Sequence, residues 1–161
     1  MPRCIVLLLA AAALLAPAAP AGAAPQRLWA TINVCDTIAH PDSIGIRASM
    51  PGSGARHEQM FMRFRVQFFR GADGHWHTIS KGADTGFVPV GSAAYQARQA
   101  GRLFTFAPPA GGSYELRGKV NFEWRRGRRV VAHAARLTTA GHRSAVGSDP
   151  AGYSAATCVI A

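Results

Sequence analysis

The chain has 161 residues, of which 48% are hydrophobic and 16% are charged, and its formal net charge is +10. This length suits one ordinary domain with a core of its own, so several domains are not expected. The eight acidic residues are too few for a carboxylate-rich calcium loop, whereas the 18 basic residues, 16 of them Arg, favour anionic partners.

The N-terminus has the three parts of a secretory signal peptide. Arg3 provides a basic start, residues 4–16 are an unbroken apolar run, and Ala21-Gly22-Ala23 is an A-x-A cleavage pattern. An uncleaved membrane anchor is the weaker alternative, because a bilayer-spanning helix needs about 20 apolar residues. We therefore predict a signal peptide at residues 1–23 and one domain at residues 24–161. The mature chain should lack a transmembrane segment and be secreted, extracellular or cell-surface.

Hydrophobic residues alternate with polar ones along most of the domain. Period two over many residues is typical of a strand with one buried and one solvated face, as in antiparallel sheets. The pattern predicts strands at residues 28–35, 43–49, 60–69, 75–80, 86–90, 103–107, 114–125, 129–138 and 156–160.

Two of these strands, residues 60–69 and 114–125, alternate most clearly. Their inward faces predict a core that contains Met60, Phe64, Phe68, Val120, Phe122 and Trp124. No segment predicts a helix convincingly; the nearest candidate, residues 93–100, is short and bounded by glycines. About eight short strands separated by turns predict an all-β, antiparallel β-sandwich.

Cys35 and Cys158 remain after signal-peptide cleavage. An even pair of cysteines in an oxidising compartment predicts a disulfide. The bond would join the first strand to the last and close a loop of more than a hundred residues. The chain-entropy model assigns such a loop a stabilisation of about 4–5 kcal/mol.

The segment RRGRR, residues 125–129, lies between two predicted strands. Gly127 can adopt a positive φ, so the sequence predicts a hairpin tip here. This geometry is explained without a ligand, although four arginines at one tip could also hold an anion.

The run LFTFAPPAGGSYEL, residues 103–116, resembles the E–F corner of immunoglobulin-like and fibronectin type III-like sandwiches. The resemblance implies an immunoglobulin-like sandwich in which Tyr114 hydrogen-bonds back to the corner and holds it. The chain departs from antibody domains, whose disulfide joins strands B and F, because its cysteines lie near opposite chain ends. The whole chain also resembles small secreted actinobacterial proteins of unknown function, a likeness that implies no activity.

Few residues form a pattern typical of a catalytic or metal site. His75 and His77 share one side of a predicted strand beside Trp76, which we expect to be buried, and they are weak candidates for a metal site. Asp36, His40 and Asp42 could assist acid–base chemistry, but carboxylates in such a loop more commonly satisfy turn amides. His142 and Ser144 occur in a Gly/Ser-rich loop without a nucleophile motif. We therefore expect no catalysis, no metal and no cofactor.

The polar faces of the two long strands and the hairpin tip carry most of the predicted binding residues. If these strands share a sheet, their cations form one surface with Phe61 and Phe69 interleaved, which suits anionic polymers. The candidate anion-binding residues are Arg63, Arg65, Arg117, Lys119, Arg125, Arg126, Arg128 and Arg129. Arginines that only keep the sheet soluble and guard its edges are the alternative interpretation.

These features favour a secreted, non-catalytic binding or adhesion module. Its expected partner is an anionic envelope glycan, an anionic lipid surface or another secreted protein. Two alternatives stay open: a small extracellular enzyme that uses His75 and His77, and an inhibitor or effector that presents a loop to another protein.

Overall fold

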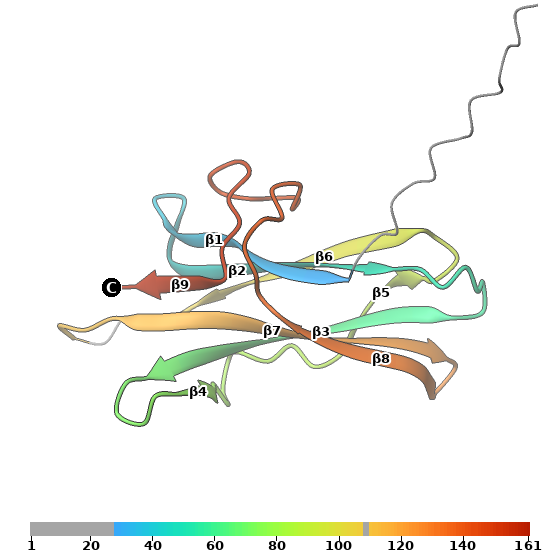
Figure 1. Ribbon diagram of the computed structural model, residues 1–161, viewed down its shortest axis with the longest axis horizontal. Helices are drawn as coiled ribbons and strands as arrows, with labels where there is room; N and C mark the ends of the chain where they lie inside the picture. Colours follow the sequence, from blue (N-terminus) through green and yellow to red (C-terminus); the bar gives the residue numbers. More distant parts are fainter. Residues whose placement is uncertain (1–27, 108–109) are drawn as a thin grey trace, which may run out of the picture.

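The computed structural model describes residues 28–107 and 110–161, and within these ranges it contains nine strands and no helix. Figure 1 shows β1, β2 and β6 on one side of the molecule and β3, β7 and β8 on the other. The predicted all-β class with antiparallel sheets is therefore confirmed. The predicted signal peptide lies outside the described residues, among which no helix is long and apolar enough to cross a membrane.

Sheet A contains three strands in the order β1-β2-β6. They are β1 (Trp29–Thr37), β2 (His40–Pro51) and β6 (Ala97–Thr105). Both neighbouring pairs are antiparallel. The free edge of β1 is covered by the segment 139–156, because Ile32 exchanges two backbone hydrogen bonds with Ala155 and the Ala30 carbonyl accepts one from Thr139.

Sheet B contains six strands around the central pair β3–β7. Its strands are β3 (Gln59–Arg70), β4 (His75–Thr78), β5 (Val88–Ser92), β7 (Tyr114–Arg126), β8 (Arg129–Leu137) and β9 (Thr157–Ile160). β4 and β5 pair with β3, whereas β8 and β9 pair with β7. The chain passes from sheet A to sheet B between β6 and β7.

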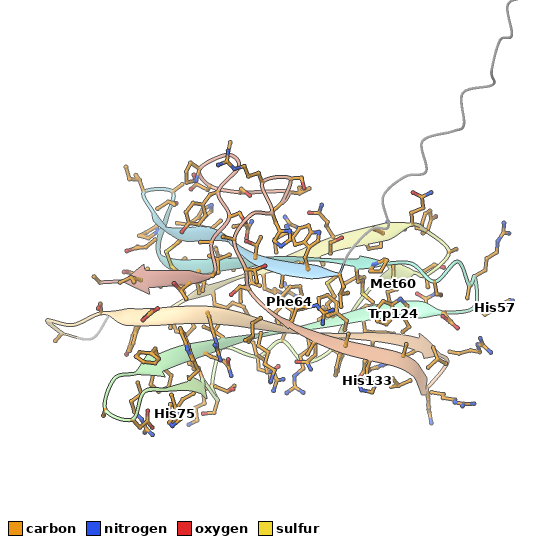
Figure 2. The ribbon with its side chains drawn as sticks, viewed as in Figure 1. His57, Met60, Phe64, His75, Trp124 and His133 are labelled. Atoms are coloured by element: carbon orange, nitrogen blue, oxygen red, sulfur yellow. A yellow bond between two sulfur atoms is a disulfide. The ribbon has the colours of Figure 1, made fainter. Side chains whose placement is uncertain are left out.

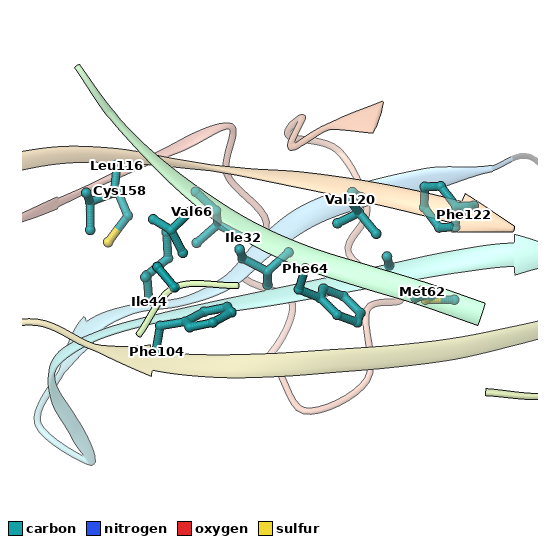
Figure 3. Packing of buried hydrophobic residues seen from close by; sticks show 14 of the residues in the cluster. Ile32, Ile44, Met62, Phe64, Val66, Phe104, Leu116, Val120, Phe122 and Cys158 are labelled. Atoms are coloured by element: carbon teal, nitrogen blue, oxygen red, sulfur yellow. The ribbon is translucent and has the colours of Figure 1, made fainter. Parts of the chain in front are cut away.

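The hydrophobic core lies between the two sheets (Figure 3). Ile32, Ile44 and Ile46 contribute from sheet A, and Phe64 and Phe122 contribute from sheet B. Of the six predicted core residues, Met60, Phe64, Val120 and Phe122 are fully buried, while Phe68 and Trp124 pack against the core at its margin. The alternation in β3 and β7 therefore separates the core-facing side chains from the outward-facing ones as predicted.

The extent of β6 differs from the prediction. The pattern predicts a strand at residues 103–107, but β6 begins at Ala97 and ends at Thr105. Its first half, with Arg98, Gln99 and Gly101, has no apolar alternation, because it belongs to an edge strand and none of its side chains is fully buried. Backbone pairing with β2 holds this half in the sheet, so its side-chain pattern gives little indication that it is a strand.

The disulfide prediction is confirmed, because Cys35 and Cys158 are bonded. The bond connects β1 with β9 across a separation of 123 residues. It therefore links sheet A to sheet B near the two ends of the described chain.

Candidate anion-binding face

β3 and β7 form one continuous antiparallel ladder from Gln59 opposite Arg125 to Phe68 opposite Leu116. Because their odd-numbered residues point away from the core, the ladder brings these residues into rows on the outer surface of sheet B. We call this surface the basic face. It comprises Phe61, Arg63, Arg65, Gln67 and Phe69 of β3 and Arg117, Lys119, Asn121, Glu123 and Arg125 of β7.

Two of the five cations on the basic face are neutralised by carboxylates. Arg63 forms a bidentate pair with Asp84, which follows β4 in the chain, and the Arg63 Nε to Asp84 Oδ1 distance is 2.7 Å. The hydrogen bonds from Arg63 lower the pKa of Asp84, and the charge of Arg65 contributes less. Arg125 donates from Nε to Glu123 Oε2 at 2.6 Å. These two ion pairs reduce the positive potential at one end of the face.

Arg65, Arg117 and Lys119 form what we call the cationic cluster. Arg65 lies directly opposite Lys119, and Arg117 occupies the next row opposite Gln67. Arg65 donates to the Asn121 side-chain oxygen at 2.7 Å, and Arg117 donates to the Gln67 side-chain oxygen at 2.9 Å. These partners are neutral amides, and none of the three cations forms an ion pair within residues 28–107 and 110–161.

The local environment leaves the cluster charged. Burial lowers the pKa of Arg117, but a guanidinium remains protonated at neutral pH. Glu115 lies on the same side of β7 as Arg117, yet it forms no ion pair with any described residue. Glu123 pairs with Arg125 on its own strand.

Aromatic rings flank the cations at both ends of the face. The Arg117 guanidinium lies 4.3 Å from the centroid of Trp76, which also contacts Phe69 with ring centroids 5.4 Å apart. At the other end Arg125 lies 4.3 Å from the Phe61 ring centroid and 4.9 Å from that of Phe87. These contacts hold both guanidinium groups against apolar surfaces.

Two of these aromatic residues change the sequence-based interpretation. Trp76 was expected to be buried, but it is only partly buried and belongs to the outer surface, because it pairs with outward-facing Phe69. Phe87 lies within the strand predicted at residues 86–90, but the structure places it in the irregular connection before β5, which begins at Val88. It approaches Arg125 only because β5 pairs with β3.

The hairpin tip is separate from the cationic cluster. β7 and β8 are joined by Gly127, with a φ of 59°, and Arg128, so the tip is a two-residue turn after the last pair, Arg126 opposite Arg129. Lys119 and Arg126 are seven residues apart on β7, or about 23 Å at roughly 3.3 Å per residue. The eight predicted binding residues therefore divide into five on the basic face and three at the tip.

Arg126 has a structural partner. It donates to Glu58 Oε1 at 3.0 Å, and Glu58 also accepts a hydrogen bond from the Ser53 hydroxyl at 2.7 Å. These hydrogen bonds, first that from Ser53 and then that from Arg126, lower the pKa of Glu58. Arg128 and Arg129 are exposed, so they are the tip residues available to a ligand.

The histidine candidates do not converge. His77 lies 2.9 Å from Asp73 through Nε2, whereas His75 is exposed. Figure 2 shows His75 at the opposite end of the molecule from His57 and His133. Across the described residues, no group of three or more His, Cys, Asp or Glu side chains is arranged to hold a metal ion.

The acidic residues Asp36 and Asp42, expected in a loop, lie in β1 and β2 beside the turn that joins these strands, and they stabilise its backbone. Asp36 and Asp42 have positive φ values of 44° and 56°. The Asp42 amide donates to Asp36 Oδ1 at 2.7 Å, and the His40 amide donates to the Thr37 hydroxyl at 3.2 Å. The carboxylate of Asp36 thus stabilises this turn.

His142 is held in a structural stack. Its ring lies 4.6 Å from the Trp29 ring centroid with an interplanar angle of 11°. Its Nε2 is 3.1 Å from the Thr139 hydroxyl, and its amide donates to Ser154. Burial lowers the pKa of His142.

No protein-family model, curated protein or solved structure matches this chain.

Proposed function

We propose that the protein is a secreted, non-catalytic binding module whose basic face holds an anionic envelope glycan. The observation that carries this proposal is the cationic cluster of Arg65, Arg117 and Lys119. Like charges directly opposite each other on neighbouring strands destabilise a sheet. Arg65 and Lys119 occupy such a pair without a compensating ion pair in the described part of the chain, and an anionic ligand would offset that cost.

The shape and chemistry of the face support an extended polymer as the ligand. Its cations follow the two strands in successive rows, and Trp76 lies against Arg117 at one end. Regularly repeated anionic groups can contact several such cations at once, while an aromatic ring offers an apolar surface to a sugar ring. Nucleic acid and anionic lipid share the negative charge and are therefore comparison ligands in the test.

We assign the domain to an immunoglobulin-like sandwich as part of the same proposal. Two antiparallel sheets around a shared core and a chain that changes sheet between β6 and β7 support this assignment. Tyr114 begins β7, where it pairs with Ile160 and packs against the core. In this proposal it stabilises the corner, part of which, residues 108–109, lies outside the described ranges. The disulfide and the N-terminal pattern support secretion.

The test is binding of the mature domain to a uronic-acid polysaccharide, a neutral polysaccharide, DNA and anionic lipid vesicles at low and physiological salt. The decisive variant is Arg65→Gln/Lys119→Gln. Its matched control is Arg128→Gln/Arg129→Gln, which removes the same charge from the tip. We expect selective, saturable binding to the acidic polysaccharide that falls about tenfold or more only in the first variant.

Equal losses in the two double variants would indicate a response to net charge alone and would refute the basic face as a site. Indiscriminate binding that disappears at physiological salt would refute the proposed function. Selective binding lost only in the tip variant would move the site to Arg128 and Arg129.

A further inference from the structure

A pocket of about 240 Å³ opens on the face of sheet A that points away from the core. β1, β2 and β6 contribute to it, together with one residue of the C-terminal segment. The lining includes Val34, His40, Arg47, Arg102 and Leu103 together with three glycines. No pattern along the chain indicates this site, because its residues come from four separate segments.

Two glycines limit the space around Arg47, and a third, Gly45, limits the space beside Val34 in the same lining. A Cβ atom on Gly101 would lie 2.8 Å from the Ile46 carbonyl oxygen and 3.2 Å from Arg47 Nε. A Cβ on Gly147 would lie 2.9 Å from Arg47 Nη2, and Gly147 also has a φ of +71°. Gly45 is similarly restricted, since its Cβ would lie 2.8 Å from that of Val34. Side chains at these positions would crowd or fill the pocket.

Arg47 is the unusual residue in this pocket. Its Nε is buried without a hydrogen-bond partner, and its guanidinium forms no hydrogen bond or ion pair within the described residues. Arg65 and Arg98 also have a buried unpaired Nε, but Arg65 bonds Asn121 and Arg98 lies 4.0 Å from the Tyr95 ring centroid. Burial lowers the pKa of Arg47. A partly desolvated cation with no partner is costly unless an anion approaches it.

The pocket has the charge and walls of a small-anion site. Arg102 adds a second cation, and none of the lining residues is acidic. Val34 and Leu103 give the pocket apolar surface. A guanidinium in such surroundings matches a planar carboxylate, which can accept two parallel hydrogen bonds from it.

We propose that this pocket binds the carboxylate of a small molecule, with Arg47 as its anchor and Arg102 as a second contact. This site is distinct from the basic face, which lies on the other sheet, so either proposal can fail without the other. Two sources share the required chemistry: a uronic acid and the free C-terminus of a short peptide.

The test is titration of the folded, disulfide-bonded domain with two probes at constant ionic strength, followed by amide NMR. The probes are glucuronate and an acetylated dipeptide with a free carboxylate, and their neutral controls are glucose and the amidated dipeptide. We expect saturable shifts at the amides of Gly45, Gly101 and Gly147 with one or both carboxylates and not with the neutral molecules. The probe that binds more tightly shows whether the carboxylate comes from a uronic acid or from a peptide C-terminus.

The decisive variant is Arg47→Met, which keeps the apolar stem and removes the charge. We expect binding to weaken at least about tenfold while the unfolding midpoint stays the same or rises, because the variant removes a partly buried cation that has no ion-pair partner among the described residues. A purely structural arginine would instead lower the midpoint. Arg136→Met, an exposed arginine of β8, is the matched control and should leave the titration unchanged.

Absence of carboxylate-specific shifts in the wild-type domain would overturn the proposal, and so would unchanged binding in Arg47→Met. If Arg47→Met does not fold, the comparison of carboxylate with neutral probes in the wild type still decides. In that case Arg47→Lys, which keeps the charge but loses the planar fork, should bind measurably more weakly than the wild type.

Discussion

Arg65 of β3 lies directly opposite Lys119 of β7, so two cations occupy one cross-strand pair at the centre of sheet B. The Arg65 side chain turns to the amide oxygen of Asn121, and Lys119 has no ion-pair partner in the described part of the chain. This arrangement is unfavourable for the sheet itself. Its ion-paired neighbours, Arg63 and Arg125, show how the same fold neutralises cations elsewhere.

Lys119→Glu should therefore stabilise the domain. The substitution converts a repulsive cross-strand pair into an attractive one, and we expect the free energy of unfolding to rise by about 0.5–1 kcal/mol. Urea denaturation at low salt measures this change, which should shrink at high salt because of screening. Lys81→Glu, in an exposed loop, is the charge-matched control. A loss of stability in Lys119→Glu would mean that Lys119 stabilises the folded domain.

Removal of the Cys35–Cys158 disulfide should be strongly destabilising. The bond closes a 123-residue separation between β1 and β9, and the chain-entropy model gives about 4–5 kcal/mol for a loop of this size. The double variant Cys35→Ala/Cys158→Ala should lose approximately this free energy in urea denaturation. Alkylation of freshly secreted protein followed by intact mass should detect no free thiol at these positions; two alkylated cysteines would contradict the pairing.

Acidification should weaken the stack between Trp29 and His142. Burial lowers the folded-state pKa of His142 below the ordinary value of about 6.5, so protonation favours the unfolded chain. The stability from neutral His142 is complete above about pH 6.5 and is lost as the pH falls through the lower, folded-state pKa.

His142→Phe isolates this effect, because it keeps an aromatic ring and cannot titrate. Between about pH 7 and pH 5, the wild type should lose stability relative to this variant. Unfolding curves at several pH values, subtracted pairwise, provide the measurement. A constant difference between the two proteins across this range would refute the assignment.

Gly118 should not tolerate a side chain. It lies in β7 on the core side, where a Cβ would approach Thr138 Cγ2 at 2.6 Å and Ile46 Cδ1 at 2.8 Å. Gly118→Ala should therefore cost about 1–3 kcal/mol through overpacking. Gly71→Ala is the control, since nothing lies within 4 Å of its Cβ position. Similar thermal midpoints for the two variants would show that the sheets can separate locally without cost.

The arginines of the edge strand β8 should limit its pairing with other chains. It has nine residues, eight of them exposed, including Val130, Val131 and Leu137. Charged residues and a bulge are devices that keep an open edge from pairing with another chain, and β8 has Arg129, Arg136 and an irregular register near Val130. Arg129→Thr/Arg136→Thr should increase self-association in sedimentation experiments, whereas Arg63→Thr, away from this edge, should not. Unchanged sedimentation of the β8 variant would contradict this role.

Local pattern accounts for much of the fold. Alternation in β3 and β7 identified which side chains face the core, because a strand places successive residues on opposite sides whatever its partners are. Gly127 indicated the hairpin tip in advance, because a tight turn depends mainly on the residues within it. The disulfide between Cys35 and Cys158 could be predicted because two cysteines remain after the expected cleavage and the expected compartment is oxidising. β6 was harder to predict, because pairing with β2 defines its first half and its own side chains do not.

What the sequence determined by itself was the alternating pattern, the two cysteines available to pair and the supply of cations. Only the tertiary structure decided which cations are neutralised. Arg63 meets Asp84 from 21 positions away, while Arg65 meets Lys119 across the ladder. Likewise the glycines around Arg47 come together only when β2, β6 and the C-terminal segment meet. The neutralisation of a cation and the shape of a pocket depend on contacts between distant segments. The alternating pattern along one strand contains no information about such contacts.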